Sequence, residues 1–140
     1  MSKYFKLEEF LVSDTAIRKK ISNVPSWEVV ANLSRLANFL DEMREAWGSG
    51  IRVSSGFRCP ALNSAVGGVQ NSAHQYGNAV DITPVNGKMA EFEAFLKRWL
   101  RGKKWDQCIY ESSKTGGRWI HFGLYSNKGE QRCKLFSMAV

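Results

Sequence analysis

The chain has 140 residues, 44% of them hydrophobic and 24% charged, and a formal net charge of +7. This length and composition are typical of one globular domain over residues 1–140 and exclude a disordered or fibrous chain. No apolar run approaches the roughly 20 residues of a membrane span, so we expect no stable insertion into a membrane.

The predicted elements begin with short helical turns in residues 7–20 and continue with an amphipathic helix over residues 26–47. Apolar residues recur at helical spacing in that helix, and the Gly-Ser-Gly run at 48–50 ends it. Residues 51–55 and 78–83 predict strands. The connection between these strands is long, Gly-rich and polar, and such connections are often functional.

The C-terminal part of the chain predicts a second amphipathic helix over residues 89–102. Residues 105–111, 119–125 and 132–138 predict three more strands, and the first two are expected to pair as a hairpin. Helices that precede and separate mostly antiparallel strands indicate an α+β fold, with a small, mostly antiparallel sheet and flanking helices.

Cysteine and charge patterns limit the compartment and the partners. Three widely spaced cysteines without a CxxC pair favour reduced thiols over a structural zinc site. The N-terminus lacks a long apolar stretch and a small-residue cleavage site, so we expect a protein made in the cytoplasm without a signal peptide. The basic charge favours an anionic partner, such as nucleic acid, an acidic polymer or a membrane surface, but no nucleic-acid-binding motif accompanies it.

The two histidines of the chain, His74 and His121, are expected to converge with Asp81. Side chains alternate along a strand, so Asp81 and His121 each lie on the face opposite the apolar residues of their own strand. If both apolar faces join one core, Asp81 and His121 project from the same side of the sheet, and His74 can fold over that side. Two imidazoles and one carboxylate with an open fourth position form a standard catalytic zinc set. Taken singly, each residue also has a structural interpretation, as a hydrogen-bonded histidine or a turn aspartate.

A series of motifs resembles the M15 family of zinc peptidases, which contains D-Ala-D-Ala carboxypeptidases and phage endolysins, and in particular its short phage-type members. The motifs are Ser55-Gly56-Phe57-Arg58, Leu62-Asn63, Gly67-Gly68, Ser72 to Asp81, and Trp119-Ile120-His121. They occur in the family's order at compatible spacing, and the resemblance covers nearly the whole chain. It implies a hedgehog-like, DD-peptidase-like fold and a zinc ion (Zn2+) held by His74, Asp81 and His121.

The resemblance also implies roles for residues around the metal. Arg58 is expected to face the substrate and to stabilise a developing oxyanion. Ser72 is expected to bond a histidine or the substrate, or to cap a turn, and Gln107 is a candidate for substrate binding. Trp119 is either a wall of the cleft, since it shares strand parity with His121, or a core aromatic residue.

The candidates for the general base are Glu111 and Asp106, and the remaining alternatives are a base elsewhere or a site without an efficient base. Many family members carry an acidic residue three positions before the last histidine, where this chain has Arg118. Short phage-like members instead show DQxIxE on the preceding strand, which here runs from Asp106 to Glu111. Glu111 can reach the site across the hairpin and move protons there, but it can equally be a solvated residue at a strand end.

The leading hypothesis is a zinc-dependent peptidase that cuts stem peptides or cross-links of bacterial peptidoglycan. We expect a monomeric, phage-type endolysin that acts at the cell wall after holin-type release and has no nucleic-acid partner. The alternative is a cell-wall-binding protein of the same fold that binds metal without turnover, an interpretation favoured by Arg118. A small nucleic-acid-binding protein is a third class, and only the charge suggests it.

Overall fold

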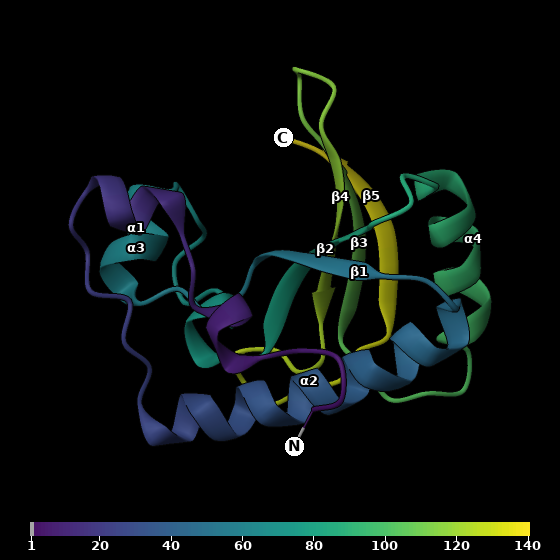
Figure 1. Cartoon of the computed structure of the whole chain (residues 1–140), viewed down its shortest axis with the longest axis horizontal. Helices are drawn as coiled ribbons and strands as arrows, with labels where there is room; N and C mark the ends of the chain where they lie inside the picture. Colours follow the sequence, from purple (N-terminus) through teal and green to yellow (C-terminus); the bar gives the residue numbers. More distant parts are fainter. Residues whose placement is uncertain (1) are drawn as a thin grey trace.

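One five-stranded sheet forms the centre of the structure, and helices pack on one of its faces (Figure 1). The computed structural model describes residues 2–140. The elements in chain order are η1 (Leu7–Phe10), α1 (Asp14–Arg18), α2 (Trp27–Trp47), β1 (Ile51–Ser55), α3 (Pro60–Ala65), η2 (Ala73–Tyr76), β2 (Ala79–Pro84), α4 (Met89–Trp99), β3 (Gln107–Ser112), β4 (Arg118–Gly123) and β5 (Lys134–Ala139).

The strands lie in the order β1-β2-β4-β3-β5. Three neighbouring pairs are antiparallel, and β5 is parallel to β3. The prediction of an α+β fold with a mostly antiparallel sheet is therefore confirmed, as is the hairpin of β3 and β4.

None of the helices in residues 2–140 is long and apolar enough to cross a bilayer.

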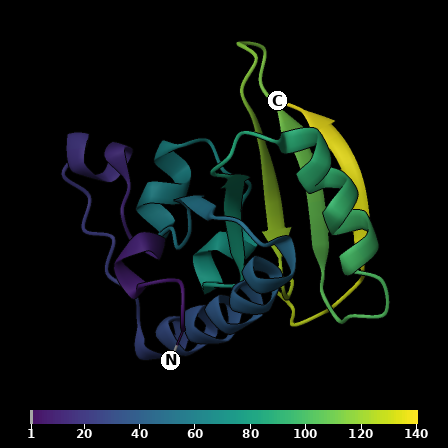
Figure 2. The same cartoon turned by 45° about the vertical axis from the view of Figure 1, so that its right-hand side comes forward.

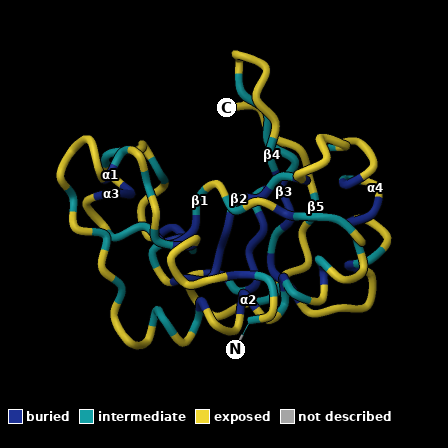
Figure 3. The backbone as a smooth tube through the Cα atoms, viewed as in Figure 1, coloured by how far each residue is buried: buried dark blue, intermediate teal, exposed yellow. Residues whose placement is uncertain are grey.

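The hydrophobic core lies between the sheet and the helices α2 and α4. Phe39 of α2 stacks on Phe122 of β4 with ring centroids 5.3 Å apart, and Trp47 of α2 meets Phe92 of α4 edge-on. Figure 3 shows the buried residues gathered along α2 and the central strands. The side chains on the opposite face of the sheet therefore lie outside this core.

The long helix α2 matches the prediction for residues 26–47. The hydroxyl of Ser26 accepts a hydrogen bond from the backbone N–H of Val29, which caps the first turn. Gly48 ends the helix in the left-handed conformation, with φ of 80°. The buried side of α2 is the apolar stripe that the sequence predicts, formed by Leu33, Leu36, Ala37, Leu40 and Met43.

The long, polar connection between β1 and β2 contains two short elements that the sequence analysis does not predict. This segment contains the helix α3 and the 3-10 helix η2. Pro60 starts α3 because its fixed φ suits the first helical position and no N–H is needed there. Ser72 starts η2 by accepting a hydrogen bond from the N–H of His74. Both elements are too short to produce a helical repeat of apolar residues, so the sequence pattern does not reveal them.

Gly56 generates the first prediction, because the N-terminal segment crosses it at close range. A Cβ at this position would lie 2.6 Å from the carbonyl oxygen of Phe10 and 2.7 Å from its Cα. That carbonyl also accepts a 2.7 Å hydrogen bond from the N–H of Phe57. We expect Gly56→Ala to lower the free energy of unfolding by about 1–3 kcal/mol, because backbone must move to make room.

Urea unfolding of wild type, Gly56→Ala and Gly117→Ala measures this effect. The Cβ of Gly117→Ala would come within 3.4 Å only of the flexible Ser113 side chain, so this variant serves as the matched control and should change stability by less than about 0.5 kcal/mol. Equal losses in both variants would show that the crossing over Gly56 is not a special constraint.

Candidate metal centre

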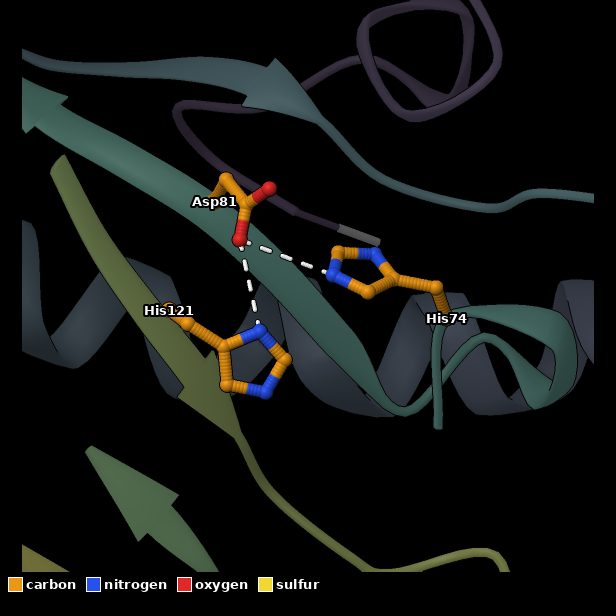
Figure 4. Close-up of side chains that lie close together, drawn as sticks. All are labelled: His74, Asp81 and His121. Atoms are coloured by element: carbon orange, nitrogen blue, oxygen red, sulfur yellow. Dashed lines mark ion pairs between the residues drawn. The ribbon is translucent and has the colours of Figure 1, made fainter. Parts of the chain in front are cut away.

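Asp81 and His121 lie directly opposite each other on the neighbouring strands β2 and β4. Their chain neighbours Val80, Ile82 and Ile120 are fully buried on the core side. The alternation of side chains therefore sends Asp81 and His121 to the other side of the sheet, as the sequence predicts. The imidazole Nδ1 of His121 lies 3.3 Å from Oδ1 of Asp81 (Figure 4).

His74 reaches the same carboxylate oxygen from the helix η2. Its Nδ1 lies 2.7 Å from the carbonyl oxygen of Gly56, and a carbonyl can only accept, so Nδ1 carries the proton and donates it. The other nitrogen, Nε2, lies 3.5 Å from Oδ1 of Asp81. Burial lowers the pKa of His74, although Asp81 opposes this effect, so the ring is neutral and Nε2 offers a lone pair toward Asp81.

The three side chains form a polar cluster in which His74 is buried and Asp81 and His121 are half-buried, with an unsatisfied acceptor at its centre. Burial alone would raise the pKa of Asp81, but its interactions with His121 and His74 hold that pKa well below the usual range. The carboxylate is thus charged. Its Oδ1 is buried and has no hydrogen-bond partner among residues 2–140. A buried anionic oxygen without a partner is costly, and a bound cation would remove that cost.

The donor set and its spacing fit zinc. Two imidazole nitrogens and one carboxylate oxygen are common zinc ligands, and the ligand atoms all lie within 4.8 Å of one another. Ligands at about 2.0–2.1 Å from a tetrahedral ion stand about 3.3–3.4 Å apart. The separations of Oδ1 of Asp81 from the two ring nitrogens, 3.3 Å and 3.5 Å, agree with that value.

A cleft of about 650 Å³ opens over this cluster. All of the other residues expected at the site line it: Arg58, Ser72, Gln107, Glu111 and Trp119. Their roles stay predictions, but the structure gives each one a position and contacts.

Glu111 and Trp119 form a pair in the wall of the cleft. They lie directly opposite each other on β3 and β4, and the indole N–H of Trp119 donates a 3.0 Å hydrogen bond to Oε2 of Glu111. Burial, followed by the nearby charge of Asp81, raises the pKa of Glu111 above its ordinary value. A carboxyl group of this kind is suited to accept a proton and return it.

Arg58 is tied to the loop that carries His74. Its backbone N–H donates a 3.1 Å hydrogen bond to the carbonyl of His74. Burial lowers the pKa of the guanidinium, while the charges of Asp81 and Glu111 oppose that shift, and an arginine stays charged under these conditions. Its Nε is buried without a hydrogen-bond partner in residues 2–140. Arg58 also lines the cleft, so the charge of its guanidinium acts on a ligand bound there.

Ser72 and Gln107 occupy different places in the cleft. Ser72 is buried, and its hydroxyl accepts the N–H of His74, so it caps η2 and fixes the loop that carries the imidazole. Gln107 begins β3, opposite Gly123, and lines the cleft. The turn-capping interpretation of Ser72 thus describes its contact, and Gln107 remains a candidate for contact with substrate.

Asp106, the other candidate for the general base, is held by Arg132. Only 2% of Asp106 is exposed, and its two carboxylate oxygens accept hydrogen bonds from Nε and Nη2 of Arg132 at 2.8 and 2.9 Å. The backbone N–H of Arg132 donates a third bond to the same carboxylate. These contacts tie the segment before β5 to β3. Asp106 also lines the cleft, but its carboxylate is occupied by Arg132, whereas no cation within residues 2–140 forms an ion pair with the carboxylate of Glu111.

Arg118 lies on the face of the sheet away from the cleft. It is three residues before His121 on β4, so strand alternation places the two side chains on opposite faces. Its guanidinium forms a 2.8 Å ion pair with Glu93 of α4. The arginine therefore does not replace a base inside the cleft of this chain.

Sequence reasoning missed two contributions to the site. One is the carbonyl of Gly56, which orients His74 and leaves no signal in a residue pattern. The other is the wall formed by Ile109 of β3 and by Phe136, Met138 and Val140 at the C-terminus. Apolar residues at every second position from 136 to 140 were a signal for this wall.

Comparison with known proteins identifies one family. The sequence profile described as Peptidase M15 matches residues 3–122. No curated protein matches the chain. The matched range includes all three residues of the cluster and both Arg58 and Glu111, and β5 lies beyond it.

Zinc binding by the three-residue cluster is the second prediction. We expect one zinc ion per chain, and His121→Ala should weaken zinc affinity by at least roughly 100-fold, because even the loss of a supporting contact costs about 10–100-fold. Metal analysis after dialysis and calorimetric titration of zinc into chelated protein measure both quantities. Cys133→Ser, which removes an exposed thiol, is the control and should bind as wild type does. Equal zinc in His121→Ala would contradict the assignment.

Proposed function

The chain belongs to the Peptidase M15 family, and from this premise we propose that it is a zinc-dependent peptidase acting on bacterial peptidoglycan. The observation that carries the proposal is the convergence of two imidazoles, those of His74 and His121, on the buried, unsatisfied Oδ1 of Asp81 in a cleft. Two charged residues line the same cleft: Glu111, whose carboxyl group has a raised pKa, and Arg58.

In this proposal different side chains of the cleft have different roles in amide hydrolysis. His74, Asp81 and His121 would hold the zinc ion, which when bound would polarise a carbonyl as a Lewis acid and lower the pKa of water to about 7. Glu111 accepts a proton from the attacking water as the new C–O bond forms. It then gives that proton to the leaving nitrogen as the C–N bond breaks.

Two neighbours prepare these steps. Trp119 occupies Oε2 of Glu111 with its indole N–H, which fixes the carboxylate and leaves Oε1 for the water. Arg58 brings a positive charge to the cleft, where it opposes the negative charge that develops on the carbonyl oxygen. Both groups are in place before a substrate arrives, so little reorganisation is needed during the reaction.

The substrate class and the biological role follow from the resemblance of the motifs. We propose stem peptides or cross-links of peptidoglycan as the substrate, and a phage-type endolysin that acts as a monomer at the cell wall after holin-type release. The open cleft and the basic net charge of +7 are compatible with a large, anionic wall.

The alternative of a metal-binding protein without turnover rested on Arg118. Because Arg118 pairs with Glu93 on the other face of the sheet, it does not weigh against turnover. Glu111 lies inside the cleft and provides a candidate base there. Hydrolysis is therefore the better-supported function.

Hydrolysis by Glu111 is the third prediction. Purified protein is incubated with peptidoglycan, with and without a chelator, and zinc is then restored while released peptides are identified by mass spectrometry. Cleavage should stop with the chelator and return with zinc. Glu111→Gln should lower kcat by about 10²–10⁴-fold, because the proton acceptor is lost, and should still bind zinc.

Asp106→Asn is the matched carboxyl-to-amide control. It should lower the stability of the fold, because Arg132 loses its anion, and should leave the turnover of folded molecules close to that of wild type. A loss of kcat in Asp106→Asn, with Glu111→Gln active, would transfer the role of base to Asp106. Zinc binding by wild type without any released peptide would contradict the peptidase proposal.

A further inference from the structure

The last strand, β5, is an addition to the part of the chain that the family profile matches. The match ends at residue 122, and β5 spans Lys134–Ala139. It lies at the edge of the sheet beside β3, where Figure 2 shows it next to the C-terminus. The ion pair of Arg132 with Asp106 holds the segment just before β5 against the start of β3. Six successive residues of β5 then pair with β3 in parallel register.

The register of β5 brings its apolar side chains to the cleft face. Phe136 lies opposite Ile109, and Ile109 lies opposite His121, so these residues continue the row that starts at Asp81. Met138 lies opposite Glu111, in the next row. The cleft therefore has a metal-binding end on β2 and β4 and an apolar end on β5.

The side chains at the apolar end of the cleft are not part of the hydrophobic core. Phe136 is 39% exposed and Met138 is 42% exposed, and both line the cleft together with Val140. Leu135, on the other face of the same strand, is the residue that packs against the core. Scattered exposed apolar residues need no explanation, but alternate residues of one edge strand that line one cleft form a surface that an apolar ligand would cover.

We infer that Phe136, Met138 and Val140 form a subsite for an apolar side chain of the peptide substrate, two to three residues away from the bond that is cut. The inference rests on the proposed function. Neighbouring strands lie about 4.8 Å apart, so β5 is about 10 Å from β4 and its His121. An extended peptide covers about 3.3 Å per residue, so its third residue from the cluster reaches β5.

The substrate class follows from this distance. A dipeptide held at the cluster cannot reach β5, whereas a longer peptide can place an apolar side chain there. A second hollow adjoins the cluster on the other side, shares Arg58 and Asp81 with the cleft, and extends to Ser54 of β1. Space on both sides of the cluster favours cleavage within an extended peptide over removal of one terminal residue.

The experiment compares peptides of two lengths. The bond that wild type cuts in peptidoglycan is identified by mass spectrometry, and synthetic peptides are built around it. The long peptide carries an apolar residue three positions from the bond on each side, and the short one contains only the two residues that flank the bond. Steady-state kinetics give kcat and KM for wild type, for the double variant Phe136→Ser with Val140→Ser, which leaves Met138 beside Glu111 unchanged, and for Trp27→Ser.

The expected result is a selective loss on the long peptide. The double variant should lower kcat/KM for the long peptide by about 10- to 200-fold, mainly through KM, and leave the short peptide unchanged. Replacing both residues by leucine keeps the surface apolar and should retain most of the activity. Trp27, which is 89% exposed on α2, is the control, and Trp27→Ser should leave both peptides unchanged.

Several results would overturn the inference. An equal loss on both peptides would assign a structural role to β5, and zinc content and thermal unfolding of the variant would confirm that reading. No loss on either peptide, with an active wild type, would refute the subsite and leave the peptidase proposal intact. A wild-type dimer that sedimentation detects and the double variant disrupts would identify the surface as a contact between two copies. Failure of wild type to cut peptidoglycan would refute the proposed function and the subsite with it.

Discussion

The carboxylate of Asp81 is the constraint on which the site depends. It is half-buried and charged, its Oδ1 is buried between two imidazoles, and such a group is tolerated in a protein only when partners surround it. Those partners come from segments far apart in the chain, and they meet because β2 and β4 pair with Asp81 opposite His121. A slip of one residue in this register would send one of the two side chains into the core.

The apolar face of the sheet maintains that register. Each residue next to Asp81 and His121 is buried against α2 and α4, so the core selects the same alignment that the site requires. The connection after β1 adds His74, the third residue of the cluster, and two backbone contacts fix it: the carbonyl of Gly56 accepts from His74, and the carbonyl of His74 accepts from Arg58. The site is thus preorganised by groups that do not themselves touch a metal.

The sequence predicts the side on which Asp81 and His121 lie, because alternation along a strand is local. It does not predict that the two residues are direct partners, since register depends on the packing of distant segments. It also does not reveal α3 and η2, whose few residues carry no helical repeat, or the carbonyl of Gly56. The last strand is visible in the sequence, but its parallel position beside β3 is not, because Asp106 and Arg132 meet only in the folded chain.

The position of β5 connects substrate selection with proton transfer. Glu111 lies between Trp119 and Met138 in one row across the sheet, so bulky side chains flank its carboxylate on both sides. This burial already raises the pKa of Glu111. A peptide whose apolar side chain covers Met138 would remove more water from the same carboxylate, and electrostatic interactions strengthen where water is excluded. Longer substrates would therefore gain contact area on β5 and a more basic Glu111 together, whereas a dipeptide would gain neither.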